Sequence, residues 1–221
     1  MDGGKRRAMS SRQKAQRRQA ILDVAWVEFA ARPYAAILMA EVAAAAGLAK
    51  GTLYLYFPTK EALFLAVLEA QLAAWFDAVD ASLDAGAVLT ATAVADVLCV
   101  TLEARPGLAR LLALLHGVLE ANVDRATALA FKRFLLARVT ATGERLERRL
   151  ALAPGQGVQA LLWTHALVIG LGSMTDAPPV IREVQALPEL ALFDFAFGPA
   201  LVTTLRLLLR GMEGEALGRK V

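Results

Sequence analysis

Residues that mark catalytic or metal-binding proteins are scarce in this 221-residue chain. It has one cysteine, Cys99, which excludes an intramolecular disulfide, and two histidines, His116 and His165. No CxxC pair or Cys/His cluster is present, so no structural zinc site is expected. The patterns GxSxG, HExxH and GxxxxGK(S/T) do not occur. Without a nucleophile, an acid–base pair or a metal-ligand set, the sequence predicts no enzyme, no catalytic residue, no metal and no cofactor.

Glycine and proline are also sparse, and no alternating pattern typical of β-strands appears. Alanine and leucine dominate a chain that is 57% hydrophobic, with a mean hydropathy of +0.48. Residues of high helix propensity with few breakers favour helices throughout. The sequence therefore predicts an all-α protein.

A signal peptide is not evident, because the basic first twenty residues lack an apolar core segment. Residues 150–175 contain no charged side chain and could suggest a membrane span. Pro154, Gly155 and several polar residues interrupt that stretch, and what remains is too short and too polar for a span. A helix buried inside a soluble assembly is favoured over a membrane span, so we expect a cytoplasmic protein without a membrane partner.

Charge is distributed unevenly along the chain. Residues 1–60 hold ten Lys and Arg against four Asp and Glu, a net charge of +6. The whole chain carries +3, so residues 61–221 carry −3. A basic head on a mildly acidic body indicates that the head meets a polyanion. A basic tail that only improves solubility remains the alternative for residues 5–18.

Apolar residues at helical spacing, separated by turn residues, predict about nine helices. Arg32-Pro33 ends the first, Gly47 ends the second, and Thr59 caps the fourth. We expect a loop at the "TDAPP" segment and a kink at Gly198-Pro199 inside the ninth helix. The expected ranges are about 13–31, 39–47, 50–56, 60 to a break at Gly86, 88–104, 108–119, 124–152, 158–174 and 190–210.

The second and third helices, joined by a turn that contains glycine, have the layout of a helix-turn-helix at about residues 38–57. In such a motif the second helix enters the major groove of DNA. Leu53 and Phe57, one turn apart, would face the core. The remaining groups suit a groove lined by phosphates: cations, hydroxyls, a glycine that permits close approach and a leucine that could contact a thymine methyl. The residues concerned are Lys50, Gly51, Thr52, Tyr54, Leu55, Tyr56 and Lys60. A helical hairpin that packs only on its neighbours is the alternative.

At these positions the sequence resembles the tetracycline-repressor (TetR/AcrR) family of bacterial transcription regulators. The segment "EVAAAAGLAKGTLYLYFPTKEALF" (41–64) resembles the family's DNA-binding signature nearly throughout, as do "ILDVAWVEFA" and the aromatic Tyr34. The resemblance covers about the first quarter of the chain. It implies a homodimer of subunits with nine or so helices, paired through the last two helices, and a body whose ligand cavity controls the spacing of the two heads. Carried over by position, the resemblance makes Lys50, Thr52, Tyr54, Tyr56 and Lys60 DNA contacts.

The chain departs from the family pattern at two positions. The family usually has Thr or Ser at the start of the second helix, where this chain has Ile37 and Leu38, and often Ser before the third, where it has Ala49. The missing hydroxyls would weaken phosphate anchoring. We hypothesise that the basic N-terminal arm compensates by reaching the duplex.

Ligand contacts in the body can be ranked only by chemistry. Aromatic, polar and polarisable side chains in its apolar helices are the candidates for lining a cavity, and a chain this apolar favours a lipophilic effector. Core packing is the default for the aromatics, a core or pocket position for the histidines, and a buried position for Cys99. The candidates are Trp75, Cys99, Arg105, His116, Phe134, Trp163 and His165.

We therefore expect a basic arm and helix-turn-helix domain at 1–62 and a helical effector-binding and dimerisation domain at 63–221. The segments "VQALLWTHALVIGLG" and "LFDFAFGPALVTTLRLLL" are too apolar to face water, which favours pairing with a second copy. The function expected is a ligand-responsive, dimeric repressor on a pseudo-palindromic double-stranded operator. The alternative is a helical small-molecule binding protein whose head has weak or no affinity for DNA.

Overall fold

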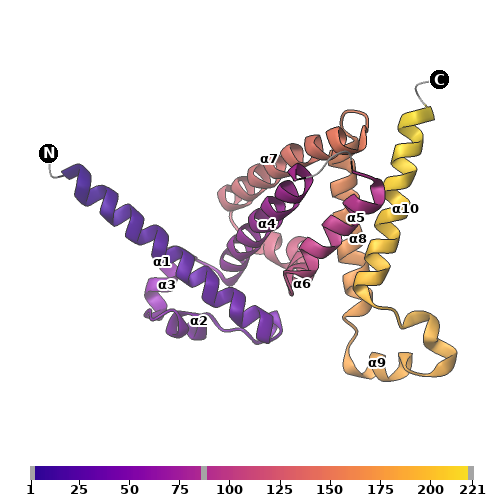
Figure 1. Ribbon diagram of the computed structural model, residues 1–221. Helices are drawn as coiled ribbons and strands as arrows, with labels where there is room; N and C mark the ends of the chain where they lie inside the picture. The colour runs from indigo at the N-terminus through magenta and orange to yellow at the C-terminus, as the bar shows by residue number, and fades with distance from the viewer. Residues whose placement is uncertain (1–2, 86–88, 219–221) are drawn as a thin grey trace. The chain divides into compact units, whose positions relative to one another are not determined.

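The computed structural model describes residues 3–85 and 89–218, and the side chains of residues 12–85 and 89–213. Those residues form helices, turns and loops with no strand among them, which confirms the all-α prediction. The α-helices, labelled in Figure 1, are α1 (Gly3–Ala31), α2 (Met39–Ala45), α3 (Lys50–Tyr56), α4 (Lys60–Asp84), α5 (Ala91–Glu103), α6 (Leu108–Ala113), α7 (Arg125–Leu150), α8 (Gln156–Thr175), α9 (Pro179–Gln185) and α10 (Phe197–Gly218).

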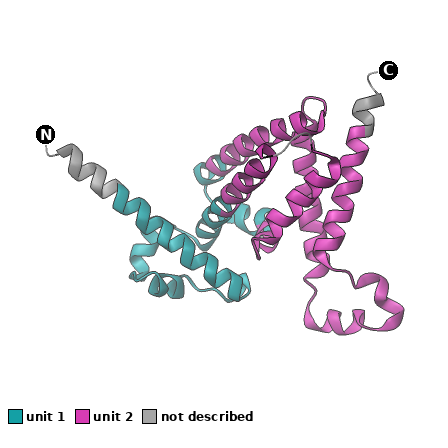
Figure 2. Ribbon diagram, viewed as in Figure 1, with its two compact units in different colours: residues 1–70, 115–129 teal, residues 71–114, 130–221 magenta. Residues whose placement is uncertain are grey.

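The chain forms two compact units, shown in two colours in Figure 2. Unit 1 takes in residues 1–70 and 115–129, and unit 2 takes in residues 71–114 and 130–221. The helix α4 begins in unit 1 and continues into unit 2. The domain boundary predicted at 62/63 falls inside this helix and stays a prediction.

Unit 1 is built on aromatic packing between α1 and the first turns of α4. The Phe29 ring lies 5.8 Å from Phe64, and Tyr34, in the 3-10 turn η1 (Tyr34–Ala36), meets Phe64 edge-on at 5.2 Å. The Thr59 hydroxyl accepts a hydrogen bond of 3.0 Å from the Ala62 N–H, which confirms the predicted cap of α4. These contacts fix where α4 starts, immediately after α3.

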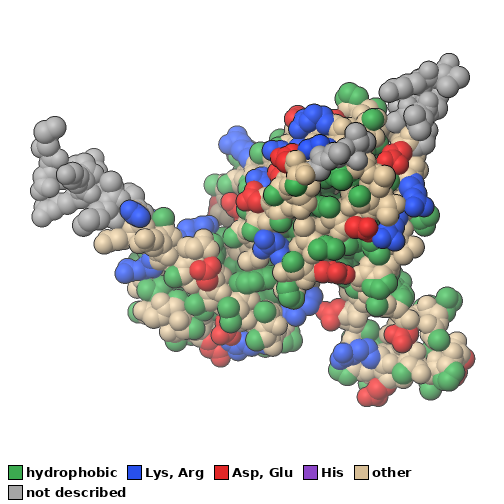
Figure 3. Space-filling view, viewed as in Figure 1, with side chains coloured by type: hydrophobic (Ala, Val, Ile, Leu, Met, Phe, Trp, Pro, Cys, Tyr) green, Lys and Arg blue, Asp and Glu red, His purple; other side chains and the backbone are tan. Residues whose placement is uncertain are grey.

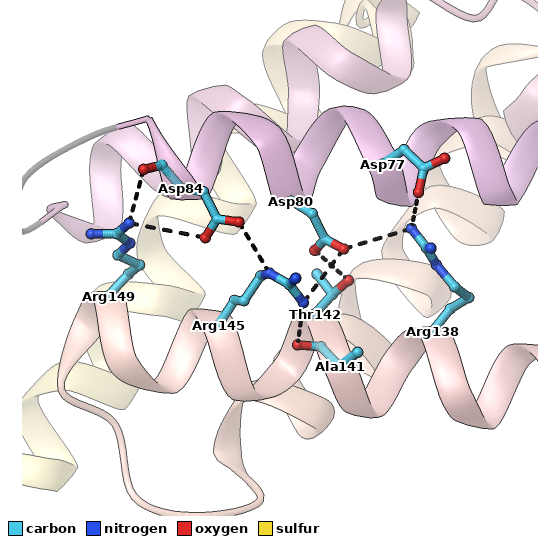
Figure 4. A network of polar contacts seen from close by, with 8 residues as sticks. All are labelled: Asp77, Asp80, Asp84, Arg138, Ala141, Thr142, Arg145 and Arg149. Carbon is cyan, nitrogen blue, oxygen red and sulfur yellow. Dashed lines mark hydrogen bonds and ion pairs between the residues drawn. The ribbon is translucent and has the colours of Figure 1, made fainter.

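In unit 2 a row of aspartates on α4 faces a row of arginines on α7 (Figure 4). Arg138 binds Asp77 at 2.6 Å, and Arg145 reaches Asp84 at 3.4 Å. Asp80 lies between these pairs, 3.6 Å from each arginine, and accepts a 2.7 Å hydrogen bond from the buried Thr142 hydroxyl. The two helices therefore pair through charge along one edge.

The helices α7 and α8 touch backbone to backbone. A Cβ at Gly157 would overlap the carbonyl group of Gly143, and a Cβ at Gly143 would lie 2.7 Å from the Val158 nitrogen. Only residues without a side chain permit so close an approach.

The expected sixth helix is shorter than predicted. It ends at Ala113 and is followed by the wider π-helical turn η2 (Leu115–Leu119) and the 3-10 turn η3 (Glu120–Asn122). Gly117, a poor helix former, lies in the middle of η2, and Leu115 and Leu119 at its ends are both buried. The burial of both leucines thus favours the wider turn over the regular α-helix that the apolar spacing of the sequence predicts.

The expected ninth helix is also wrong at its start. Residues 179–193 form the short helix α9 and the 3-10 turn η4 (Pro188–Phe193), and the long helix α10 begins at Phe197. Pro199 falls in the first turn of α10, where backbone N–H groups have no acceptor within the helix. It therefore removes no ladder hydrogen bond, and the predicted mid-helix kink is replaced by a helix start.

Candidate nucleic-acid interface

The helix-turn-helix is held down by the two residues that the sequence assigns to its inner face. Leu53 is fully buried and Phe57 is 3% exposed. The Arg18 guanidinium of α1 lies 5.3 Å from the centre of the Phe57 ring, at cation–π distance. Between α2 and α3, Gly47 has a φ of 67°, the left-handed conformation predicted for the end of α2. The short helix α3 is thus fixed at both of its ends.

The opposite face of α3 points outward. Lys50 and Gly51 are exposed, Tyr54 is 40% exposed and Leu55 is 84% exposed. The apolar side chain of Leu55 is therefore accessible to another molecule. Thr52 and Tyr56 are half-buried at the margins of this face. Of the seven predicted contacts, six therefore gather on one short helix.

Gly51 is surrounded by open space on its outer side. A Cβ built at this position would meet no atom within 4 Å. The glycine therefore serves no internal close contact in unit 1. The room it leaves lies on the same helix turn as Lys50 and next to Thr52, where another molecule can approach the backbone.

Lys60, the seventh predicted contact, is held inside unit 1. Its ammonium donates to the Tyr34 carbonyl oxygen and lies 4.0 Å from the centre of the Tyr34 ring. Burial lowers the pKa of Lys60. The Tyr34 hydroxyl lies 3.3 Å from the Glu61 carboxylate, and burial, with that charge, raises the pKa of Tyr34. This clasp, which links η1 to the first turn of α4, was missed in the sequence because it depends on residues 26 and 27 positions apart.

The start of α2 is apolar at both positions where a hydroxyl was expected. Ile37 is buried in the core, and Leu38 is the N-cap and is 56% exposed. In place of a capping side chain, the Glu41 carboxylate lies 3.4 Å from the Leu38 N–H and binds Arg32 at 2.6 Å. Hydrogen bonding to Arg32 lowers the pKa of Glu41. The α2 terminus is thus stabilised, but it offers no hydroxyl to a phosphate.

The seven candidate ligand residues are spread over α4, α5, the turn after α5, η2, α7 and α8. Trp75 and Cys99 are buried, as expected, and Arg105 donates to the carbonyl of Ala74, next to Trp75, at 2.9 Å. Phe134 and His165 are half-buried, on α7 and α8. Trp163 is 40% exposed on α8. Arg105 is thus linked to the backbone next to Trp75.

His116 departs from its predicted core or pocket position. It lies in unit 1 on η2, is exposed, and its Nδ1 is 3.2 Å from the Glu120 carboxylate. Its apolar neighbours in sequence point inward while the π-helical turn directs the imidazole outward. The expectation of a buried histidine here was therefore wrong.

One feature of the body could not be read from the sequence. The indole N–H of Trp75 is buried with no hydrogen-bond acceptor among the described residues. An unpaired buried donor costs about 1–3 kcal/mol, so such a group is a candidate for pairing with a bound molecule.

Comparisons with known proteins cover both units. A family model described as "Bacterial regulatory proteins, tetR family" matches residues 21–67. A second, "Tetracyclin repressor-like, C-terminal domain", matches residues 69–216, which is more than half of the chain. A search of curated protein sequences finds no significant match.

Solved structures share the fold at low sequence identity. The fatty acid degradation regulator FadR from Bacillus halodurans is 20% identical, with a TM-score of 0.55 over 87% of this chain and 93% of its own. A transcriptional regulator from Cytophaga hutchinsonii is 22% identical, with a TM-score of 0.50 over 91% and 96%. A tetR-family regulator from Streptomyces coelicolor is 18% identical, with a TM-score of 0.50 over 92% and 89%.

Proposed function

The chain belongs to the tetR family of bacterial regulatory proteins, and from this premise we propose that it is a dimeric repressor released from its operator by a small lipophilic effector. Membership makes it a DNA-binding transcriptional regulator; repression, the effector and the operator are our proposal. The observation that carries it is the two-sided α3 helix, whose Leu53 and Phe57 are buried while Lys50, Tyr54 and Leu55 face outward.

On DNA, α3 would lie in the major groove. Lys50 would neutralise a phosphate, the Thr52, Tyr54 and Tyr56 hydroxyls would donate to phosphate oxygens, and Leu55 would contact a thymine methyl. Gly51 would let the backbone approach. Because Lys60 is bound to Tyr34, we propose a smaller direct role for it.

Selection of bound sequences from a random DNA pool tests this proposal, since a dimer should enrich a pseudo-palindrome with half-sites about 34–36 Å apart or a multiple of that spacing. Tyr54→Ala should then lower affinity for the selected operator about tenfold or more, because it removes a groove contact. Val27→Ala, an exposed α1 position, is the control and should change little. No enrichment, or equal binding by both variants, would contradict the proposal.

For the dimer, the support comes from two exposed stripes in unit 2. The outward positions of α8 recur at helical spacing, and so do those of α10. On α8 they are Gln159, Leu162, Trp163, Ala166, Gly170, Ser173 and Met174, and on α10 they are Pro199, Thr203, Leu207, Arg210 and Gly211. We propose that these stripes pair with those of a second copy in a four-helix interface, consistent with a protein in the cytoplasm rather than in a membrane.

For the effector, the support comes from Trp75. We propose that a ligand in the body of unit 2 accepts a hydrogen bond from its buried indole, with Arg105 nearby. A thermal-shift screen against straight-chain fatty acids and aromatic hydrophobes tests this. Any compound that stabilises the chain should bind Trp75→Phe, which keeps an aromatic ring but lacks the N–H, several-fold more weakly. Trp26→Phe, on α1 in unit 1, is the matched control, and equal loss in both variants would refute the role of Trp75.

The second candidate function is a small-molecule binding protein without DNA affinity. The apolar Ile37 and Leu38 at the start of α2 favour it, because they supply no phosphate contact. A wild-type chain that binds no duplex at low salt, yet is stabilised by a compound in the thermal-shift screen, would establish this alternative.

A further inference from the structure

The helix α1 extends well beyond the core of unit 1. It runs without a break from Gly3 to Ala31, but Ile21 is the first buried side chain among those described. Residues 12–20 are all exposed, which corresponds to a helix length of about 13 Å. Figure 2 shows the described part of α1 continuing past α2 and α3 within unit 1.

This extension is strongly basic. It carries Arg12, Lys14, Arg17 and Arg18, and the first carboxylate that follows is Asp23. Blue side chains gather along this part of the helix in Figure 3. Lys14 is one turn from both Arg17 and Arg18, and like charges at this spacing destabilise a helix by about 0.2–0.5 kcal/mol a pair. The extension therefore carries repulsion that a bound polyanion would relieve.

The position of Arg18 shows which way the basic surface faces. Arg18 continues the stripe of α1 that packs inward at Leu22, Ala25 and Phe29, and its guanidinium lies over Phe57 at the end of α3. Lys14, one turn earlier on the same stripe, and Arg17 beside it prolong this face beyond Phe57. The basic side chains of the α1 extension therefore lie on the side of unit 1 where α3 ends.

A duplex fits this surface better than a membrane. An interfacial membrane helix needs large apolar residues opposite its basic face. Between residues 12 and 20 the apolar side chains are only Ala15 and Ala20. Cations on a preformed helix, without an apolar face, are suited to phosphates at the surface of nucleic acid.

We propose that Arg12, Lys14 and Arg17 form a second DNA-contacting surface that binds backbone phosphates flanking the groove segment occupied by α3, with Arg18 holding the extension against Phe57. This inference rests on the DNA-binding function proposed above. Such contacts carry no base information, so they strengthen binding to every duplex alike. They also supply the phosphate anchoring that the apolar start of α2 lacks.

The test is the salt dependence of duplex binding by R12Q/K14Q/R17Q. Glutamine keeps helix propensity and side-chain length while removing the charge. Binding of the wild type and the variant to the selected operator and to a scrambled duplex is measured between about 50 and 200 mM salt. A plot of log K against log salt has a negative slope, and each lost phosphate contact makes it less steep by about 0.9. For three lost contacts we expect the magnitude of the slope to fall by about 3 per head. Affinity should fall by the same factor on both duplexes.

The matched control is R133Q/R148Q/R182Q, which removes the same charge from three exposed positions of unit 2. It should leave the slope close to that of the wild type. If both variants lower the slope equally, or if the α1 variant keeps the wild-type slope while circular dichroism shows an intact helix content, the inference is overturned. A wild-type chain that binds no duplex at any salt would instead overturn the proposed function. Tighter binding to phosphatidylserine vesicles than to duplex at equal salt would overturn the inference in favour of a membrane surface.

Discussion

The helices α4 and α8 are both long and apolar enough to cross a membrane, yet they differ in how the rest of the chain covers them. Of the most apolar 18-residue stretch of each, 61% is buried in α4 but only 28% in α8. The helix α4 also has a charged edge, where three aspartates meet arginines of α7. Between Gln156 and Thr175, α8 has no charged side chain at all. Two helices of similar length and composition therefore differ in burial: α4 is mostly covered by its own chain, whereas most of the apolar stretch of α8 is not.

The largest expected effect separates the two helices by one leucine-to-alanine substitution in each. Leu83→Ala in α4 removes a fully buried side chain and should lower the free energy of unfolding by about 2–5 kcal/mol. Leu162→Ala in α8, where the leucine is 54% exposed, should cost less than about 0.5 kcal/mol in dilute, monomeric protein. Denaturant titrations at low concentration measure both. Equal losses would erase the difference between the helices.

Next in size is the effect of a charge on the exposed face of α8. Leu162→Asp should weaken dimerisation by about 2–4 kcal/mol, because an unpaired carboxylate would be buried between subunits. Sedimentation velocity over a concentration series measures the dissociation constant. Leu136→Asp, on an exposed position of α7, should leave it unchanged. If Leu162→Asp leaves the dissociation constant of the dimer unchanged, the exposed stripe of α8 is not the interface.

The charged edge of α4 should give an intermediate effect. Asp80→Ala leaves the buried Thr142 hydroxyl without its acceptor and removes the charge between two arginines, so a loss of about 1–3 kcal/mol in unfolding free energy is expected. Asp77→Ala removes a pair whose aspartate side chain is 68% exposed and should cost less than about 1 kcal/mol. Thermal unfolding of the two variants measures both losses in unfolding free energy. A larger loss for Asp77→Ala than for Asp80→Ala would contradict the greater importance that we give to Asp80.

A pH titration gives the smallest effect and tests the covered interior of unit 2. Burial raises the pKa of Cys99 on α5 to about 11. The folded state thus holds the thiol proton more tightly than the unfolded state, so this stabilisation is complete below the unfolded pKa and is lost as pH rises toward 11. We expect a loss of about 1 kcal/mol between pH 8 and 10. Cys99→Ala should lack that component, and identical pH profiles would argue that Cys99 is open to solvent.

The sequence predicted the helix-turn-helix region better than the rest of the chain because the signals in that region are local. Gly47, Thr59 and the buried pair Leu53 and Phe57 act within a turn or two of chain, and each was confirmed. The Tyr34–Lys60 clasp was not foreseen, since it joins distant residues. The seven DNA contacts themselves stay a prediction, although six share one helix.

In the rest of the chain the errors came from packing that no local pattern reports. The sixth helix was predicted too long because its apolar period does not show the wider turn around Gly117. The ninth was started too early because exposed leucines near Leu192, which is 85% exposed, resemble a helix core in sequence. Ligand candidates were chosen by residue type, and type alone could not separate the buried Trp75 from the exposed Trp163.

The contact between Gly143 and Gly157 leaves no layer of side chains to absorb movement between α7 and α8. Two helices that meet at bare backbone cannot slide past each other by exchanging rotamers, as ordinary packed helices do. Since arginines of α7 also bind aspartates of α4, we expect the three helices to move together. A displacement of α8 is therefore expected to reach the aspartate-bearing end of α4.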